Sequence, residues 1–159
     1  MTASVLDGKR ILAVDDEPDV LTVLEQEIKD SCPNCQVDKA TTYEKGAELI
    51  NANTYDLVIL DIMGVRGFDL LGLAVKRKFR VGMLTAHDLS PEALKKSHEL
   101  GAHAYLPKDK LGEIVPFLED ILNQDYKKGW KLLLEKLGAY FDDQFDTDWK
   151  SKAGVDFWY

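Results

Sequence analysis

Polar side chains with complementary chemistry come directly after short apolar runs of this sequence. Three are the carboxylates Asp15, Asp16 and Asp61, and two later runs lead to the hydroxyl of Thr85 and the ammonium of Lys108. Carboxylates that lie together raise one another's pKa unless a cation lies among them. If the fold gathers these positions, the sequence therefore predicts a cation site.

Magnesium is the cation that suits such a group. It prefers oxygen ligands and keeps several waters, which leaves room for a phosphate-bearing substrate. A carboxylate beside the ion can act as a nucleophile and form an aspartyl phosphate. Thr85 would then hold a phosphoryl oxygen by a hydrogen bond, and Lys108 would hold one as a point charge.

The apolar runs also predict the elements that must gather these residues. They are continuous rather than alternating, which is typical of strands buried on both faces of a sheet. These runs predict four strands, at residues 11–14, 57–60, 81–84 and 104–106, and residues 36–40 form a weaker candidate for a fifth.

Helix signals fill the intervals between the predicted strands. Pro18 suits a first helical position, and Thr41 and Glu44 have the spacing of a capping box. Ser90 and Pro91 mark another helix start. A strand and helix repeated five times predict a parallel sheet covered on both faces, with ligands bound beyond the carboxyl ends of its strands.

Taken together, these features resemble the receiver domain of two-component response regulators. The resemblance covers about residues 9–125 and rests on the motifs ILAVDDEP at 11–18, LVILD at 57–61, MLTA at 83–86 and GAHAYLPK at 101–108. It implies a flavodoxin-like (βα)5 doubly wound parallel sheet with strand order 2-1-3-4-5. It also implies a signalling switch rather than a conventional enzyme.

The resemblance implies a role for each residue of the acidic group. Asp61 accepts a phosphoryl group from a sensor histidine kinase or a phosphotransfer protein. Asp16 is a direct Mg²⁺ ligand together with Asp61, Asp15 is a ligand mainly through water, and the backbone carbonyl of Met63 is a further contact.

The resemblance also implies a switch. Thr85 and Tyr105 match the pair that reorganises on phosphorylation, in which the hydroxyl moves toward the phosphoryl group and the aromatic ring swings inward. Lys108 matches the lysine that pairs with the phosphoryl group. The output would pass to a downstream protein partner through the face formed by the fourth and fifth helices and the fifth strand, or through the C-terminal tail.

The sequence departs from the family pattern in the two loops beside this group. Gly64 stands where the family usually has a proline, and the route from Asp61 to Gly67 is shorter. Lys108 is followed by Asp109 rather than by the cis-proline of the family, so either a strained cis bond persists or this loop differs.

A third departure concerns the lifetime of the phosphoryl group. Met63 and His87 occupy the two positions that tune this lifetime in the family. Because Met63 cannot orient an attacking water, the sequence predicts a longer-lived phosphoryl group.

Two alternatives to the switch use the same residues. One is a Mg²⁺-dependent phosphohydrolase with Asp61 as nucleophile. Enzymes of the haloacid-dehalogenase type place a second aspartate as general acid two residues later, and here that position is Met63. The other is a receiver-like binding scaffold that is not phosphorylated, which the intact acidic group disfavours.

Charge and composition divide the chain into a receiver domain at 9–125 and an extension at 126–159. The chain has 159 residues and a formal net charge of −8, and the extension is neutral. An acidic chain does not favour a nucleic-acid partner. Apolar runs of four or five residues are far shorter than the roughly 20 that span a bilayer, so we expect a cytoplasmic protein with no membrane partner.

The extension is rich in aromatic residues and holds all three tryptophans. Apolar positions repeat with helical spacing over 126–145, which predicts an amphipathic helix. This helix either continues the one that begins near Leu111 or forms a separate helix. Its apolar stripe either packs on its own domain or serves as a homodimer or partner interface, and its basic flank also allows contact with a membrane surface.

Histidines and cysteines lack the spacing of a metal site. We expect His87, His98 and His103 to lie on the surface. Cys32 and Cys35 form a CxxC pair after a helix instead of before one, so we expect free thiols in a loop.

Overall fold

The computed structural model describes residues 4–86 and 89–154. Five parallel strands form its sheet, in the order β2-β1-β3-β4-β5. The strands are β1 (Arg10–Val14), β2 (Gln36–Ala40), β3 (Leu57–Asp61), β4 (Arg80–Thr85) and β5 (Ala104–Pro107). Each contains the residues predicted for it, and the predicted flavodoxin-like order 2-1-3-4-5 is confirmed.

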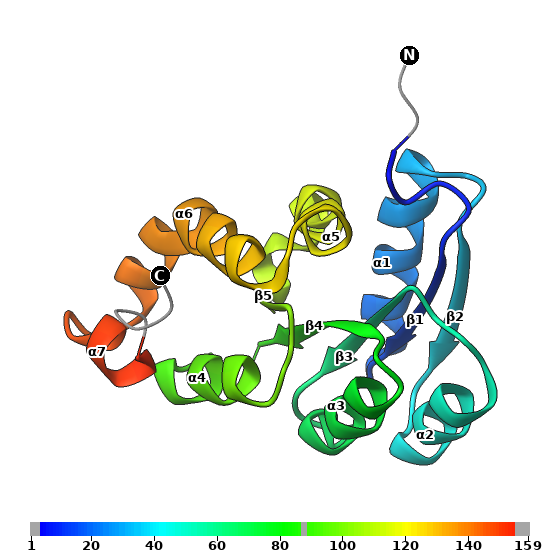
Figure 1. Ribbon diagram of the computed structural model, residues 1–159, viewed down its shortest axis with the longest axis horizontal. Coiled ribbons are helices and arrows are strands. Elements are labelled where there is room, and N and C mark those ends of the chain that lie inside the picture. Colours follow the sequence, from blue (N-terminus) through cyan, green and yellow to red (C-terminus); the bar gives the residue numbers. More distant parts are fainter. Residues whose placement is uncertain (1–3, 87–88, 155–159) are drawn as a thin grey trace.

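Five helices connect these strands or follow them. They are α1 (Pro18–Ser31), α2 (Tyr43–Ala52), α3 (Gly67–Lys76), α4 (Pro91–Glu99) and α5 (Ile114–Asn123), and a short 3₁₀ helix, η1 (Lys108–Glu113), precedes α5. Figure 1 shows α1 and α5 on one face of the sheet and α2, α3 and α4 on the other. The central strand β3 is buried along its whole length, as its continuous apolar run predicts.

Capping side chains begin several of these helices. Ser90 caps α4 as predicted, and its hydroxyl accepts a hydrogen bond from the Ala93 amide at 3.0 Å. The cap of α2 is Thr42 and not Thr41, since the Thr42 hydroxyl accepts from the Lys45 amide at 3.1 Å. The capping-box spacing was therefore wrong by one residue.

The extension forms two further helices, α6 (Tyr126–Gln144) and α7 (Trp149–Ala153). Helix α5 ends before α6 begins, because the side chain of Asp125 caps α6 by accepting from the Lys128 amide at 2.8 Å. Of the two predicted arrangements, the separate helix is therefore the one observed. Helix α7 lies in a segment for which no element was predicted.

The apolar stripe of α6 packs on its own domain. Both helices of the extension lie beyond the β5 edge of the sheet, where α6 contacts α5 and β5, and α7 contacts α4 (Figure 1). The buried residues of the stripe are Trp130, Leu133, Leu134, Leu137 and Phe141. This face of α6 is thus occupied within the chain. Among the described residues, no helix is long and apolar enough to cross a membrane.

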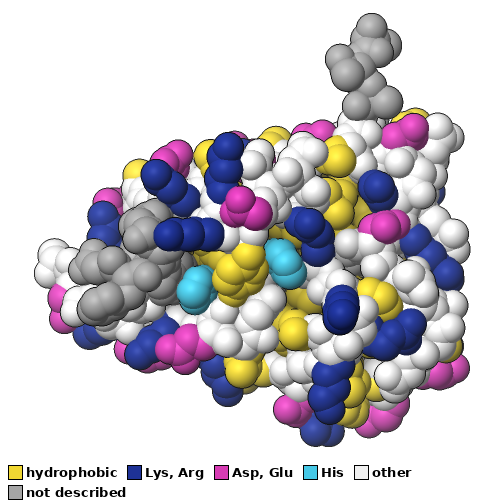
Figure 2. Space-filling view, in the orientation of Figure 1, with side chains coloured by type: hydrophobic (Ala, Val, Ile, Leu, Met, Phe, Trp, Pro, Cys, Tyr) yellow, Lys and Arg dark blue, Asp and Glu magenta, His cyan; other side chains and the backbone are white. Residues whose placement is uncertain are grey.

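His98 and His103 are both partly exposed, so they lie at the surface as expected, but each also packs against an aromatic ring. The ring of Tyr126 contacts both His98 and His103, at centroid distances of 5.4 and 5.3 Å. Figure 2 shows exposed histidine side chains on one face, with a hydrophobic side chain between them. The third, His87, lies outside the described residues.

The two cysteines have free thiols, as expected, but both are buried. Cys32 directly follows α1, and the Cys35 thiol donates a hydrogen bond to the Leu6 carbonyl at 2.7 Å. The N-terminal segment that carries Leu6 therefore covers this pair.

Candidate functional site

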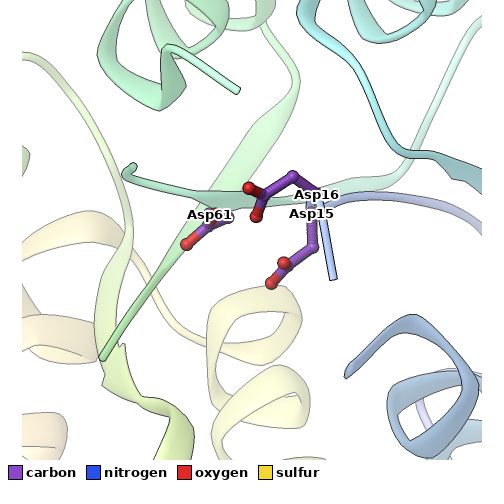
Figure 3. Close-up of side chains that lie close together, drawn as sticks. All are labelled: Asp15, Asp16 and Asp61. Carbon is purple, nitrogen blue, oxygen red and sulfur yellow. The ribbon is translucent and has the colours of Figure 1, made fainter. Parts of the chain in front are cut away.

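Three aspartates meet at the carboxyl end of the sheet. Asp15 and Asp16 follow β1, and Asp61 is the last residue of β3, which is the neighbour of β1 in the sheet. One carboxylate oxygen from each lies within 4.8 Å of the other two, and Figure 3 shows the side chains converging. Adjacent parallel strands bring their carboxyl ends to the same edge, so the juxtaposition follows from the sheet order.

Burial places two of these carboxylates in an unfavourable electrostatic environment. Asp15 is fully buried, Asp61 is 4% exposed, and Asp16 is exposed. Burial raises the pKa of Asp61 to about 7, and the neighbouring charge of Asp15 adds to the effect. Burial also raises the pKa of Asp15. A cation is therefore needed to stabilise the charged forms of both groups.

Lys108 supplies one such cation from the end of β5. Its Nζ lies 2.9 Å from Asp15 Oδ2, 3.2 Å from Asp61 Oδ1 and 3.2 Å from Glu17 Oε1. Burial of the ammonium lowers its pKa, but the hydrogen bond to Asp15 and the charge of Asp61 outweigh that effect and raise it above its usual value. Lys108 is therefore a fixed positive charge between the two strand ends.

The loop after Lys108 differs from the family arrangement. Lys108 is the first residue of η1, and no cis peptide bond occurs in the described part of the chain. The sequence allowed either a strained cis bond between Lys108 and Asp109 or a different loop, and the structure has the different loop. The ammonium still reaches the acidic group, because the 3₁₀ turn starts directly at the strand end.

Thr85 contributes an unpaired hydroxyl. It is the last residue of β4 and is 1% exposed, and its Oγ1 has no hydrogen-bond partner among the described residues. A buried hydroxyl without a partner is costly, so a ligand oxygen near it would be stabilised. Thr85 lines a cavity of about 100 Å³ whose other lining residues are Asp16, Glu17, Asp61, Met63, Gly64, Ala86 and Lys108.

Glycines shape the loop between β3 and α3. Gly64 has φ of +74°, and a Cβ there would lie 2.4 Å from the carboxylate of Asp16. A Cβ on Gly67 would lie 2.1 Å from the Asp61 carbonyl oxygen. A proline at position 64 could not adopt the positive φ, so Gly64 lets this shortened loop pass close to Asp16.

Met63 lies in the same tight turn. Its carbonyl accepts a hydrogen bond from the Val65 amide at 2.7 Å, and its side chain lines the cavity and is 51% exposed. The carbonyl retains a second lone pair for a ligand.

Tyr105 lies away from the cavity. Its ring is fully buried and contacts Phe141 of α6, with the ring centroids 6.1 Å apart. Its hydroxyl accepts a hydrogen bond from the Ser90 amide at the start of α4, at 3.0 Å. The structure thus brings the other predicted site residues together and places Tyr105 behind them, against the extension.

The oxygen donors present fit a magnesium ion. Three carboxylates within reach of one another, one of them exposed to solvent, match a hard cation that keeps part of its water shell. Sequence reasoning missed Glu17, which shares Lys108 with the acidic group. Its position directly after the paired aspartates is the signal that would have identified it.

Comparisons with known proteins agree with this geometry. The family model of the response regulator receiver domain matches residues 11–118. The two-component response regulator ARR12 of Arabidopsis thaliana is 38% identical over 108 residues, which are 64% of this chain and 17% of that protein. The regulator ARR18 of the same plant is 34% identical over 131 residues, which are 79% of this chain and 20% of that protein.

The chain therefore matches about a fifth of the length of these relatives. A solved structure also resembles it over most of its length. The response regulator receiver domain protein (CheY-like) from Methanospirillum hungatei JF-1 is 27% identical, with a TM-score of 0.57, and the match covers 86% of this chain and 95% of that one.

Proposed function

This chain belongs to the response regulator receiver domain family, and from that premise we propose that it is a phosphorelay switch with Asp61 as its phosphoacceptor. The observation that carries the proposal is the position of Asp61. It is a buried carboxylate held between Lys108 and two further carboxylates, at the edge of the sheet where ligands bind. The receiver would comprise residues 9–125, and residues 126–159 would form its extension.

The acidic group would hold the magnesium ion. Asp16 and Asp61 would be direct ligands, Asp15 would act mainly through water, and the Met63 carbonyl would be a further ligand. When bound, the ion would neutralise charge on the phosphoryl oxygens and on the carboxylates. In this proposal the ion and Lys108 together keep Asp61 ionised for attack.

In the transfer step, an oxygen of Asp61 attacks the phosphorus of a phosphohistidine on a sensor kinase or a phosphotransfer protein. An oxygen to phosphorus bond forms while the nitrogen to phosphorus bond breaks, and the electron pair of that bond stays on the imidazole. Lys108 and the Thr85 hydroxyl are placed to bind the transferred oxygens, since one is a fixed charge and the other an unpaired donor.

The cavity does not favour a phosphohydrolase. Met63 provides no general acid, and Glu17, the remaining carboxylate of the lining, is paired with Lys108. We therefore propose that the phosphoryl group is long-lived. The signal would pass to a downstream protein partner. A phosphoryl half-life of only seconds in the isolated protein would contradict the first of these points.

Phosphorylation with a small donor tests the proposal. We expect the full chain, incubated with Mg²⁺ and acetyl phosphate, to gain one phosphoryl group by intact mass, and Asp61→Asn to gain none. Asp30→Asn is the matched control, because Asp30 is an exposed carboxylate on α1. Continuous phosphate release without an adduct would favour the hydrolase, and neither an adduct nor release would favour the scaffold.

A further inference from the structure

The extension occupies the edge of the domain that Tyr105 faces. Helices α6 and α7 lie beyond β5, and α7 packs against α4 (Figure 1). We call residues 126–154 the C-terminal clasp. Its contacts with the domain divide into two groups along its length, and this division carries the inference.

The first half of the clasp, residues 126–137, is anchored to the end of α4 and to the segment before β5. The Trp130 indole donates to the Ala102 carbonyl at 2.9 Å, and the Tyr126 hydroxyl donates to the His98 carbonyl. Trp130 is 1% exposed. None of these contacts involves Tyr105 or the cavity.

The second half is anchored through aromatic rings. Phe141 contacts Tyr105, stacks on Phe145 at 5.2 Å and meets the edge of Trp149 at 5.5 Å. The Trp149 indole also donates to Asp142 at 2.9 Å, which joins α7 to α6. Phe141 thus links α7 to the ring of Tyr105.

Tyr105 in turn lies on the same face of the sheet as Thr85. It pairs in register with Met83, and Thr85 is two residues further along β4. Because side chains on a strand alternate between faces, Met83 and Thr85 share the face that carries Tyr105. The Tyr105 hydroxyl meets the start of α4 at Ser90, so a movement of its ring affects both α4 and Phe141.

We propose that the second half of the clasp, residues 141–153, is an intramolecular partner of the receiver that is released when Asp61 is phosphorylated. This rests on the proposed function. The resemblance to receiver domains implies that the Thr85 hydroxyl moves toward the phosphoryl group, which leaves space on its face of the sheet, and Tyr105 is the large side chain beside that space. As its ring moves in, Phe141 loses its support, while the Trp130 anchor stays in place.

A phosphoryl group shifts the clasp only if the docked and released states differ in contacts that the site controls. The contact between Tyr105 and Phe141 satisfies this condition, since both rings are fully buried and only one belongs to the receiver. Linkage requires the reverse effect as well, so weakening the clasp favours phosphorylation.

Hydrogen exchange of the full chain tests the inference. We expect acetyl phosphate with Mg²⁺ to raise amide exchange in residues 141–153 by about fivefold or more, and to leave residues 126–137 unchanged. Asp61→Asn should remove the response. Intact mass is measured on the same samples, so that the phosphorylated fraction is known.

Two variants distinguish loss of the contact between Tyr105 and Phe141 from a general loss of packing in the clasp. Phe141→Leu should raise exchange in 141–153 before any phosphorylation, shrink the further response, and increase the phosphorylated fraction. Leu133→Met is the matched control, because Leu133 is equally part of the buried stripe but belongs to the first half. It should keep the wild-type response.

The outcomes distinguish the two proposals. A mass gain with unchanged exchange in 141–153 would overturn the clasp and leave the phosphoacceptor intact. Equal acceleration of both halves, or the same response in Phe141→Leu as in the wild type, would also overturn it. Absence of any mass gain in the wild type would overturn both proposals.

Discussion

Two regions of this molecule bury side chains of opposite chemical character. The cavity at the carboxyl end of the sheet buries carboxylates, and the seam between the clasp and the β5 edge buries aromatic rings. The first has raised pKa values at Asp15 and Asp61 and an unpaired hydroxyl at Thr85. In the second, the polar atoms of Trp130 and Trp149 have hydrogen-bond partners.

The comparison shows that buried aromatic side chains stabilise the fold, whereas buried carboxylates lower its stability. Burying an aromatic side chain removes a large apolar area from water and contributes a few kcal/mol. Burying a carboxylate costs free energy unless a counter-charge or a ligand compensates. We therefore expect substitutions in the seam to lower stability, and substitutions in the cavity to change it in either direction.

The largest effect is expected in the seam. Trp130→Ala should destabilise the protein by about 3–5 kcal/mol, because it removes a fully buried indole and its hydrogen bond to Ala102. Urea denaturation followed by circular dichroism measures the loss. Lys127→Ala, on the exposed side of the same helix, should stay within about 0.5 kcal/mol of the wild type. A small loss in Trp130→Ala would mean that the seam is not a source of stability.

A smaller loss is expected when the counter-charge in the cavity is removed. Lys108→Met leaves the carboxylates of Asp15 and Asp61 without their ammonium, and should cost about 2–3 kcal/mol in a chelator. Added Mg²⁺ should restore part of this stability, since it supplies positive charge to the same oxygens. If Mg²⁺ stabilises the Asp15→Asn, Asp16→Asn double variant equally, the ion is bound elsewhere.

Replacing the phosphoacceptor Asp61 should raise the stability of the protein, which is the opposite of the effect expected for Lys108. The unfolded chain releases the Asp61 proton near pH 4, whereas the folded chain holds it up to about pH 7, so stability falls as the pH rises through this window. In a chelator at pH 8, Asp61→Asn should therefore be more stable than the wild type by about 1–2 kcal/mol, less than the full pKa difference implies because the amide no longer forms the ion pair with Lys108. At pH 4 the gain should vanish, and a gain that persists there would contradict this explanation.

The smallest effect concerns a titratable group of the seam. Burial, with the charge of Arg80 as a second cause, lowers the pKa of His103 to about 4, and its Nδ1 accepts from the Val81 amide at 3.2 Å. The unfolded chain binds this proton near pH 6.5, so stability should be full above that pH and fall toward pH 4, by the order of 1 kcal/mol for a partly exposed ring.

His103→Asn tests that expectation, because the amide retains an acceptor but does not titrate. The pH dependence of its unfolding free energy, measured between pH 4 and 7, should be flatter than that of the wild type. An unchanged slope would assign the dependence to other groups.

Sequence reasoning succeeded where the signal is local. Each predicted strand lies within its observed strand, and the residues at the carboxyl ends of β1, β3, β4 and β5 meet as expected. It failed where the signal depends on a partner surface. The sequence carried no local signal that Tyr126 packs against the partly exposed rings of His98 and His103, because this contact joins segments that are distant in sequence.

The sequence by itself determined the parallel sheet and the acidic edge. Continuous apolar runs identify buried strands, and parallel strands in this order must bring Asp15, Asp16 and Asp61 together. Only the tertiary structure decided the place of the clasp. An apolar stripe indicates that a helix packs against another surface, but it does not identify that surface. In this chain the surface is the β5 edge, where Phe141 contacts Tyr105.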